Sequence, residues 1–204
     1  RVTSGFVERE GQDELFDAIF THAEPRTVLT GMRGCGKTQL AAAVAAKCED
    51  EGWPIVAWIN AASREELVAD LYELALRTGI NAPKDVPPET IIRRFLDQLH
   101  SADAADRLFV FDNVENLDDL KGLTTKGSGV RVIITTTRHL DWDSLGWSPM
   151  AVGVFDREQS IALLCQRTGD AHRDAADQIA EALGDLPVAV TQAAATAKWG
   201  HYSL

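Results

Sequence analysis

The sequence predicts an α/β fold, in which helices cover a parallel β-sheet and a smaller helical unit follows. Short apolar segments alternate with longer amphipathic segments up to residue 155, and strands that alternate with helices form parallel sheets. A glycine-rich segment lies between the first strand and its helix, and only helical patterns remain after residue 155. We therefore expect a sheet domain over residues 1–155 and a helical domain over residues 156–204.

The first expected elements surround the glycine-rich segment. Residues 12–20 repeat apolar side chains at helical spacing, and residues 27–30 form a short apolar run that predicts the first strand. The Ala- and Leu-rich residues 39–48 predict a helix that ends near Gly52. Residues 54–60 are almost all apolar, as in strands that are buried on both faces of a parallel sheet.

Two helices and three strands complete the expected sheet domain. Ser63 and Glu66 have the spacing of a capping box, which predicts a helix that Gly79 ends. An amphipathic helix, expected at residues 89–100, follows a proline-rich loop. Three further apolar runs predict the third, fourth and fifth strands at residues 107–111, 131–135 and 151–155.

The helical domain is expected to contain three helices. Asp156 and Gln159 form a helix start signal, and the helix runs to Thr168. A second helix covers residues 173–183. A third begins near Pro187, because proline is favoured in the first turn of a helix.

The composition argues against several classes of function. The 204 residues carry a formal net charge of −11, which argues against nucleic acid or an anionic membrane as a partner of this segment. No apolar run reaches the roughly 18 residues of a membrane span. Three separated cysteines predict neither disulfides nor a zinc site, so we expect a cytoplasmic protein. Because residue 1 is Arg rather than Met, we expect a segment of a longer protein, with further domains after residue 204.

The glycine-rich segment, residues 31–38, matches the G-x-x-x-x-G-K-[ST] pattern of a phosphate-binding loop. Glycines let successive N–H groups point at an anion, and the following helix adds its partial positive charge. Lys37 is expected to reach the β- and γ-phosphates and the Thr38 hydroxyl to bind Mg²⁺. A turn that merely begins a helix would not explain the Lys-Thr pair. The residues expected to contact the nucleotide here are Gly31, Arg33, Gly34, Cys35, Gly36, Lys37, Thr38 and Gln39.

An acidic residue follows the third expected strand. Asp112 comes after a buried apolar run, and in nucleotide hydrolases with this loop such an acid lies beside Mg²⁺. An Asp that only caps the next turn is the alternative. The next residue, Asn113, cannot act as a general base, whereas Glu115 could orient water. These residues support nucleotide binding more strongly than fast turnover.

The fourth expected strand leads through three threonines to Arg138. If this strand lies between the first and the third, its carboxyl end faces the γ-phosphate, because ligands bind at that edge of such sheets. Arg138 would then sense the γ-phosphate through charge-assisted hydrogen bonds. A solvent-facing arginine after a strand is the alternative.

Several short segments occur together in a fixed order. They are residues 6–10, the loop with the Gln-Leu-Ala that follows it, Asp112-Asn113, residues 136–138 and the Gly-Asp-Leu-Pro segment 184–187. The combination resembles the NB-ARC module of the signal-transduction ATPases with numerous domains (STAND), above all its bacterial, NOD-like members. The resemblance implies the strand order 5-1-4-3-2 of P-loop NTPases, ATP or ADP with Mg²⁺ as ligands, and self-association of the full-length protein. It also implies that Val7 and Arg9 lie against adenine and ribose, and that Pro187 touches the base rather than only opening a helix.

The chain departs from the family pattern at three positions. Glu8 and Arg33 stand where the family usually has glycine, and Asn113 replaces the second acid of many eukaryotic members. Arg33 would either contact the phosphates or face solvent. Cys35 is either a thiolate that the loop stabilises or a small residue that fits the loop.

We therefore expect an ATP/ADP-binding switch with slow, Mg²⁺-dependent ATP hydrolysis in a signalling or regulatory protein, with Lys37, Asp112 and Arg138 as catalytic residues. Three alternatives stay open. A small-molecule kinase would need an arginine-rich lid, and no such cluster follows Arg138. A GTPase would need an Asn-Lys-x-Asp element, which the sequence lacks. A scaffold that keeps ADP without hydrolysing it is compatible with Asn113.

Overall fold

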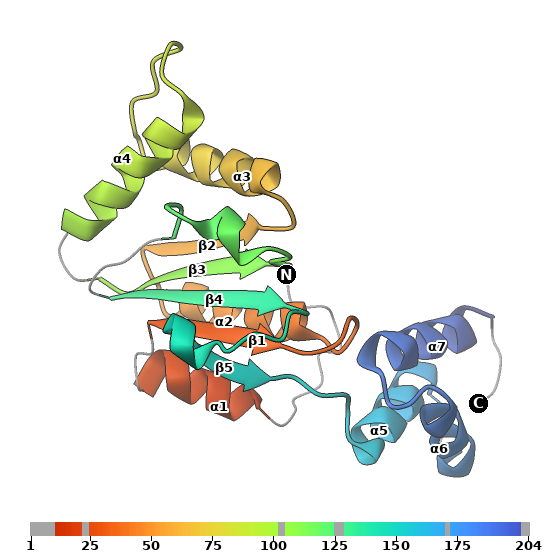
Figure 1. The fold of residues 1–204 in the computed structure, drawn as a ribbon. Coiled ribbons are helices and arrows are strands. Elements are labelled where there is room, and N and C mark those ends of the chain that lie inside the picture. The colour runs from red at the N-terminus through yellow and green to blue at the C-terminus, as the bar shows by residue number, and fades with distance from the viewer. Residues whose placement is uncertain (1–10, 22–24, 102–104, 125–128, 170–171, 201–204) are drawn as a thin grey trace.

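Five parallel strands form one sheet in the order β2-β3-β4-β1-β5 in the computed structural model of the chain (Figure 1). This order confirms the expected one, with the first strand between the fourth and the fifth. The structure describes residues 11–21, 25–101, 105–124, 129–169 and 172–200. The strands are β1 (Arg26–Thr30), β2 (Ile55–Asn60), β3 (Arg107–Asp112), β4 (Val130–Thr136) and β5 (Ser148–Ala151). Because they are parallel, their carboxyl ends meet at one edge of the sheet.

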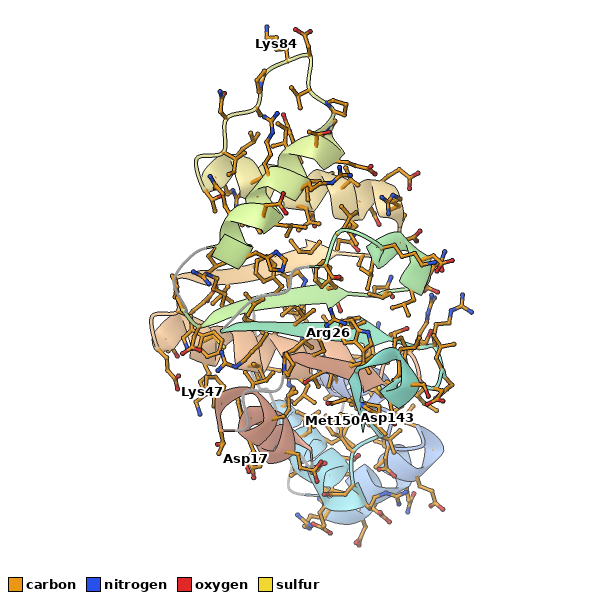
Figure 2. The ribbon with its side chains drawn as sticks, turned by 60° about the vertical axis from the view of Figure 1, so that its left-hand side comes forward. Asp17, Arg26, Lys47, Lys84, Asp143 and Met150 are labelled. Carbon is orange, nitrogen blue, oxygen red and sulfur yellow. The ribbon has the colours of Figure 1, made fainter. Side chains whose placement is uncertain are left out.

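Helices cover both faces of this sheet, and a further group of helices lies beyond the carboxyl ends of β1 and β5 (Figure 1). The connection between α3 and α4 projects away from the sheet, with Lys84 at its tip (Figure 2). The helices are α1 (Gln12–Phe16), α2 (Lys37–Asp50), α3 (Arg64–Arg77), α4 (Pro88–Ser101), α5 (Arg157–Thr168), α6 (Arg173–Ala182) and α7 (Pro187–Gly200), together with the short turns η1 (Asp17–Thr21), η2 (Leu117–Leu120) and η3 (Asp143–Leu145).

The two faces of the sheet belong to separate apolar cores, because successive strand residues point to opposite faces. In β3, Phe109 and Phe111 pack with α3 and α4, whereas Leu108 and Val110 pack with α1 and α2. All four side chains are fully buried. Replacing a buried Phe by Ala generally costs about 3–5 kcal/mol, so these residues hold the strand that carries Asp112 firmly in place.

Helices α5, α6 and α7 enclose a third core of their own, which includes Leu164, Ala176 and Val190. The capping box predicted at the start of α5 is present. The Asp156 side chain accepts a hydrogen bond from the backbone N–H of Gln159, whose side chain accepts one from the N–H of Asp156. At α3 only half of the predicted box forms, since Ser63 caps the N–H of Glu66 but the Glu66 side chain contacts the Ser63 hydroxyl instead of its N–H.

The expected position of the fifth strand, residues 151–155, is wrong. β5 lies at Ser148–Ala151 and pairs with β1 from Thr27 to Thr30. It contains Pro149, which has no N–H to donate, but an edge strand bonds to a neighbour on one side only and tolerates this. The apolar residues after β5 instead link the sheet to α5, and Phe155 packs into the core of the α5–α7 group.

Two expected helices also differ in detail. The helix expected at residues 12–20 is a short α-helix that continues as the π-helical turn η1. The helix after the glycine-rich segment begins at Lys37, two residues earlier than its apolar pattern indicates. Lys47 of this helix (labelled in Figure 2) helps it pack against α1 and η1, because its ammonium lies 4.8 Å from the ring centroid of Phe16 and 4.5 Å from that of Phe20.

Candidate phosphate-binding site

The glycines of the loop between β1 and α2 adopt backbone conformations that other residues rarely take. Gly31, Gly34 and Gly36 have φ angles of 148°, 80° and 91°. A Cβ atom at Gly31 would lie 2.3 Å from the Val152 carbonyl oxygen, and one at Gly34 would lie 2.4 Å from Cγ1 of Val188. The loop therefore needs glycine both for its turns and for the close approach of neighbouring segments.

The loop presents backbone donors at the start of α2. Among the described residues, the N–H groups of Gly34, Lys37 and Thr38 find no acceptor. Two of them lie in the first turn of a 14-residue helix, whose N-terminal end carries a partial positive charge. Donors grouped in this way suit an anion with several acceptor oxygens, such as a phosphate chain.

Lys37 is mostly buried, and its side chain folds back over the loop. The Nζ atom donates to the carbonyl oxygens of Gly31 and Met32, each at 2.9 Å, and lies 3.9 Å from the Cys35 sulfur. No carboxylate in the described parts of the chain forms an ion pair with Lys37. A buried ammonium without a counter-ion is suited to bind an added anion.

Thr38 and Asp112 lie in direct contact at the carboxyl edge of the sheet. The Thr38 hydroxyl donates to Oδ1 of Asp112 at 2.9 Å, and the Thr135 hydroxyl donates to the same oxygen at 2.5 Å. These hard oxygen donors suit Mg²⁺, which takes few protein ligands and fills its remaining positions with phosphate oxygens and water. Among the described residues, no group of three or more His, Cys, Asp or Glu side chains is placed to hold a metal ion by itself.

The Arg138 side chain is exposed, but it is joined to the segment after β3. Its Nε atom donates to the carbonyl oxygen of Glu115 at 2.9 Å, and its Nη2 lies 3.8 Å from the Glu115 carboxylate. Arg33 approaches the same carboxylate from the loop, with Nη2 2.9 Å from Oε1. Glu115 thus lies between two arginines that come from different elements.

The segments after β3 and β4 are joined by a ladder of hydrogen bonds. Thr135 accepts from the N–H of Asn113 through its hydroxyl and from that of Val114 through its carbonyl, each at 2.9 Å. The buried Thr136 hydroxyl donates to the Val114 carbonyl at 2.7 Å and accepts from the N–H of Arg138 at 3.0 Å. The threonines before Arg138 therefore fix its backbone relative to Asp112.

The start of α7 rests directly on the loop. The N–H of Val188 donates to the Gly34 carbonyl at 3.1 Å, and the N–H of Phe155 donates to the Asp185 carbonyl at 3.0 Å. Arg157 anchors this segment by donating through Nε and Nη2 to the Asp185 carboxylate. These hydrogen bonds hold the pKa of Asp185 below its ordinary value of 3.8.

The structure thus brings most of the predicted site residues together. Gly31, Gly34, Gly36, Lys37 and Thr38 form the loop, Asp112 joins Thr38, and Pro187 opens α7 beside the loop. Arg33 is bound to Glu115, and Cys35 is completely buried, which disfavours a freely reactive thiol. Gln39 is half-buried in the first turn of α2. Val7, Arg9 and Glu8 lie outside the described residues.

Three features of the site were missed by sequence reasoning. These are the contact of Val188 with Gly34, the hydroxyl of Thr135 on Asp112, and the position of Glu115 between two arginines. The run of threonines before Arg138 is evident in the sequence, but the sequence does not indicate their hydrogen-bond partners. Such contacts depend on how segments distant in sequence approach one another.

The parallel sheet and the glycine loop place the chain in the class of P-loop nucleoside-triphosphatase folds. Within this class the chain belongs to the NB-ARC family, because the model of the NB-ARC domain matches residues 10–174. This confirms the resemblance on which several expectations rest. No curated protein matches the sequence.

Solved structures of the same fold include Cdc6p from Pyrobaculum aerophilum, with a TM-score of 0.66 and 15% identity over 98% of this chain and 66% of that chain. A STAND ATPase with a tetratricopeptide repeat sensor from Pyrococcus horikoshii has a TM-score of 0.53 and 18% identity, over 89% of this chain and 28% of that chain. AMPPCP-bound DnaA from Aquifex aeolicus has a TM-score of 0.57 and 14% identity, over 95% of this chain and 62% of that chain.

This chain therefore spans less than two thirds of the length of each of these three proteins. At such identities the likeness concerns the fold alone. Within the described part of the chain, no helix combines the length and the apolar character that a membrane crossing requires.

Proposed function

We propose that this chain is an ATP/ADP-binding switch module that hydrolyses ATP slowly with Mg²⁺. The observation that carries the proposal is the bond between the Val188 N–H and the Gly34 carbonyl. The loop that would hold the phosphates is also the segment that the start of α7 contacts. A change in the loop on nucleotide binding would therefore alter how the α5–α7 group is held.

Each residue of the site has a role in this proposal. Lys37 and the loop N–H groups hold the phosphates, and Arg138 binds the terminal phosphate. Thr38 and Asp112 would hold Mg²⁺, which, when bound, neutralises charge on the phosphates. Val7, Arg9 and Pro187 would contact the adenosine, as the family resemblance implies.

Slow hydrolysis is supported by the residues that follow Asp112. Asn113 is exposed, has a φ angle of 63°, and carries an amide that cannot accept a proton from water. Glu115 could do so, but its carboxylate is paired with Arg33 and Arg138. A site that binds ATP and turns it over slowly suits a switch, because each state persists long enough to be read.

The two parts of the switch would be residues 1–155 and residues 156–204. The separate core of α5, α6 and α7 supports this division. A ligand shifts an equilibrium between two domain arrangements only as far as its affinities for them differ. In the full-length protein, which we propose to be cytoplasmic, the shift would control self-association and thereby signalling.

Nucleotide titrations of a Lys37→Ala variant test this proposal. Charge-assisted hydrogen bonds contribute about 1.5–3 kcal/mol, so the variant should lose affinity for ADP and ATP by about tenfold to a hundredfold, measured by calorimetry. Lys121→Ala is the control, since Lys121 is exposed and its ion-pair partner among the described residues is Asp118. Wild-type affinity in the Lys37 variant would overturn the proposal, and binding without any hydrolysis would favour an ADP-holding scaffold.

A further inference from the structure

Arg33, Glu115 and Arg138 form a charged triad at the edge of the site, between the phosphate loop and the end of β4. Each oxygen of the Glu115 carboxylate faces a different arginine, Oε1 facing Arg33 at 2.9 Å and Oε2 facing Arg138 at 3.8 Å. Two positive charges and one negative charge leave the triad with a net charge of +1. The loop position of Arg33 places one of these charges directly beside the phosphate donors.

The three members of the triad are held with unequal firmness. Arg138 and Glu115 belong to the segments after β4 and β3, which the hydrogen bonds of Thr136 join. The hydrogen bond from the Arg138 Nε to the Glu115 carbonyl fixes the two residues further. The Arg33 side chain is 78% exposed, and its partner among the described residues is Glu115. Arg33 can therefore leave the carboxylate without disturbing the rest of the site.

We propose that Arg33 is a second phosphate-sensing arginine, and that Glu115 competes with the terminal phosphate of a nucleoside triphosphate for Arg33 and Arg138. This inference rests on the proposed nucleotide binding. A terminal phosphate carries more charge than a carboxylate and accepts bidentate bonds from a guanidinium. Glu115 thus lowers the affinity of the site for the triphosphate and thereby sets the ratio of its affinities for ATP and ADP.

The strength of the Arg33–Glu115 pair is suited to this competition. Exposed ion pairs contribute at most about 1 kcal/mol, because water screens them. The pair orders Arg33 when no triphosphate is bound, yet a phosphate displaces the carboxylate at little cost. A nucleoside diphosphate has no γ-phosphate to reach the triad, so its affinity should depend little on Glu115.

Binding of AMPPCP, a non-hydrolysable ATP analogue, and of ADP should be compared in Glu115→Gln and Arg33→Ala variants. We expect Glu115→Gln to raise the affinity for AMPPCP by about twofold to fivefold, while the affinity for ADP changes less than twofold. Arg33→Ala should lower the affinity for AMPPCP alone. In the double variant the gain from Glu115→Gln should shrink, because one of the two competed arginines is gone.

Glu89→Gln is the matched control, because it breaks another partly exposed pair, with Arg64 at 2.9 Å, away from the site. It should leave both affinities unchanged. An unchanged ratio of the two affinities in Glu115→Gln, or a lower affinity for AMPPCP, would overturn the inference while leaving the proposed function intact. A wild-type chain that binds neither nucleotide would overturn both.

Discussion

Gly34 shows how one residue without a side chain joins two parts of the molecule. Its φ angle of 80° lies in the left-handed region, and its α-hydrogen faces the Val188 side chain. The carbonyl of the same residue accepts the Val188 N–H. Glycine here serves the turn and also allows α7 to approach the phosphate loop.

Gly34→Ala should therefore destabilise the protein more than the same change at a comparable turn. The new methyl group would lie 2.4 Å from Cγ1 of Val188, and valine cannot readily rotate away, because its χ1 angle is restricted. We expect the free energy of unfolding, measured with urea, to fall by about 2 kcal/mol or more. Backbone strain accounts for about 1–2 kcal/mol and overpacking for at least about 1 kcal/mol.

Gly52→Ala separates these two contributions. Gly52 has a φ angle of 75°, but a Cβ atom there would meet nothing within 4 Å. The excess loss in Gly34→Ala should shrink when Val188 is also changed to Ala, because the atom at 2.4 Å is then gone and the closest remaining one is the Cβ at 3.3 Å. Equal losses in the two single glycine variants would show that α7 does not press on the loop.

At the scale of elements, the segment between α6 and α7 is held by α5. Arg157 lies in the first turn of α5 and binds the Asp185 carboxylate through two nitrogens, while Nη1 binds Asp177 at 2.9 Å. Asp185 has a φ angle of 53°, so the turn before Pro187 adopts a conformation that few residues tolerate. The ion pair and the turn together set where α7 begins.

Asp185→Asn should make the protein less stable at neutral pH and remove part of its acid sensitivity. Asn also accepts the left-handed conformation, so the change mainly removes the charge. Hydrogen bonds from Arg157 lower the pKa of Asp185 in the folded state below its ordinary value of 3.8. The ionised Asp185 therefore contributes its full stabilisation at pH values well above 3.8. This stabilisation is lost as the pH falls through 3.8 toward the pKa of the folded state. The melting temperatures of the variant and the wild type should differ by a few degrees at pH 7 and converge below pH 3.8. A difference that is constant with pH would contradict this role.

The sequence predicted the elements well where local chemistry decides them. Lys37 and Thr38 were placed by a motif whose backbone geometry is local, and the capping residues Asp156 and Gln159 marked the start of α5 correctly. β5 was misplaced, because the expectation followed the more apolar residues 151–155, whereas the observed strand contains Pro149, which its edge position makes acceptable. The sheet order was inferred from family resemblance, since local patterns do not determine which strands become neighbours.

Much of the site depends on contacts that local patterns cannot reveal. Glu115 lies 82 positions after Arg33 and 23 before Arg138 in the chain, and only the sheet order brings the three together. Val188 meets Gly34 because the segment from Phe155 to Asp185 directs the helical group back onto the loop. A sequence indicates which residue types are available for chemistry, whereas the topology determines their partners.

At the scale of the whole molecule, the described residues form three apolar cores, and the α5–α7 group contacts the candidate phosphate loop. The cores on the two faces of the sheet share the strands, but the core of α5–α7 is separate. Its described connections to the rest include the hydrogen bond from the Val188 N–H to the Gly34 carbonyl. Because its apolar residues pack with one another, this core can unfold separately from the sheet when no nucleotide holds the two together.

Calorimetry should therefore show two unfolding transitions for the chain without nucleotide, and a single, higher one with ADP. A ligand at about 100 times its Kd stabilises by about 2.7 kcal/mol, which corresponds to a rise in Tm of about 5–10 °C for a protein of this size. Because the proposed site lies where the loop meets α7, bound ADP should stabilise both parts together. At the same ADP concentration Lys37→Ala should gain only about 0.4–1.4 kcal/mol, because its affinity is tenfold to a hundredfold lower, so its transitions should shift by about half as much as those of the wild type or less. If ADP raised only the transition of the sheet, nucleotide and the α5–α7 group would be uncoupled, and the proposed switch would lack its mechanical link.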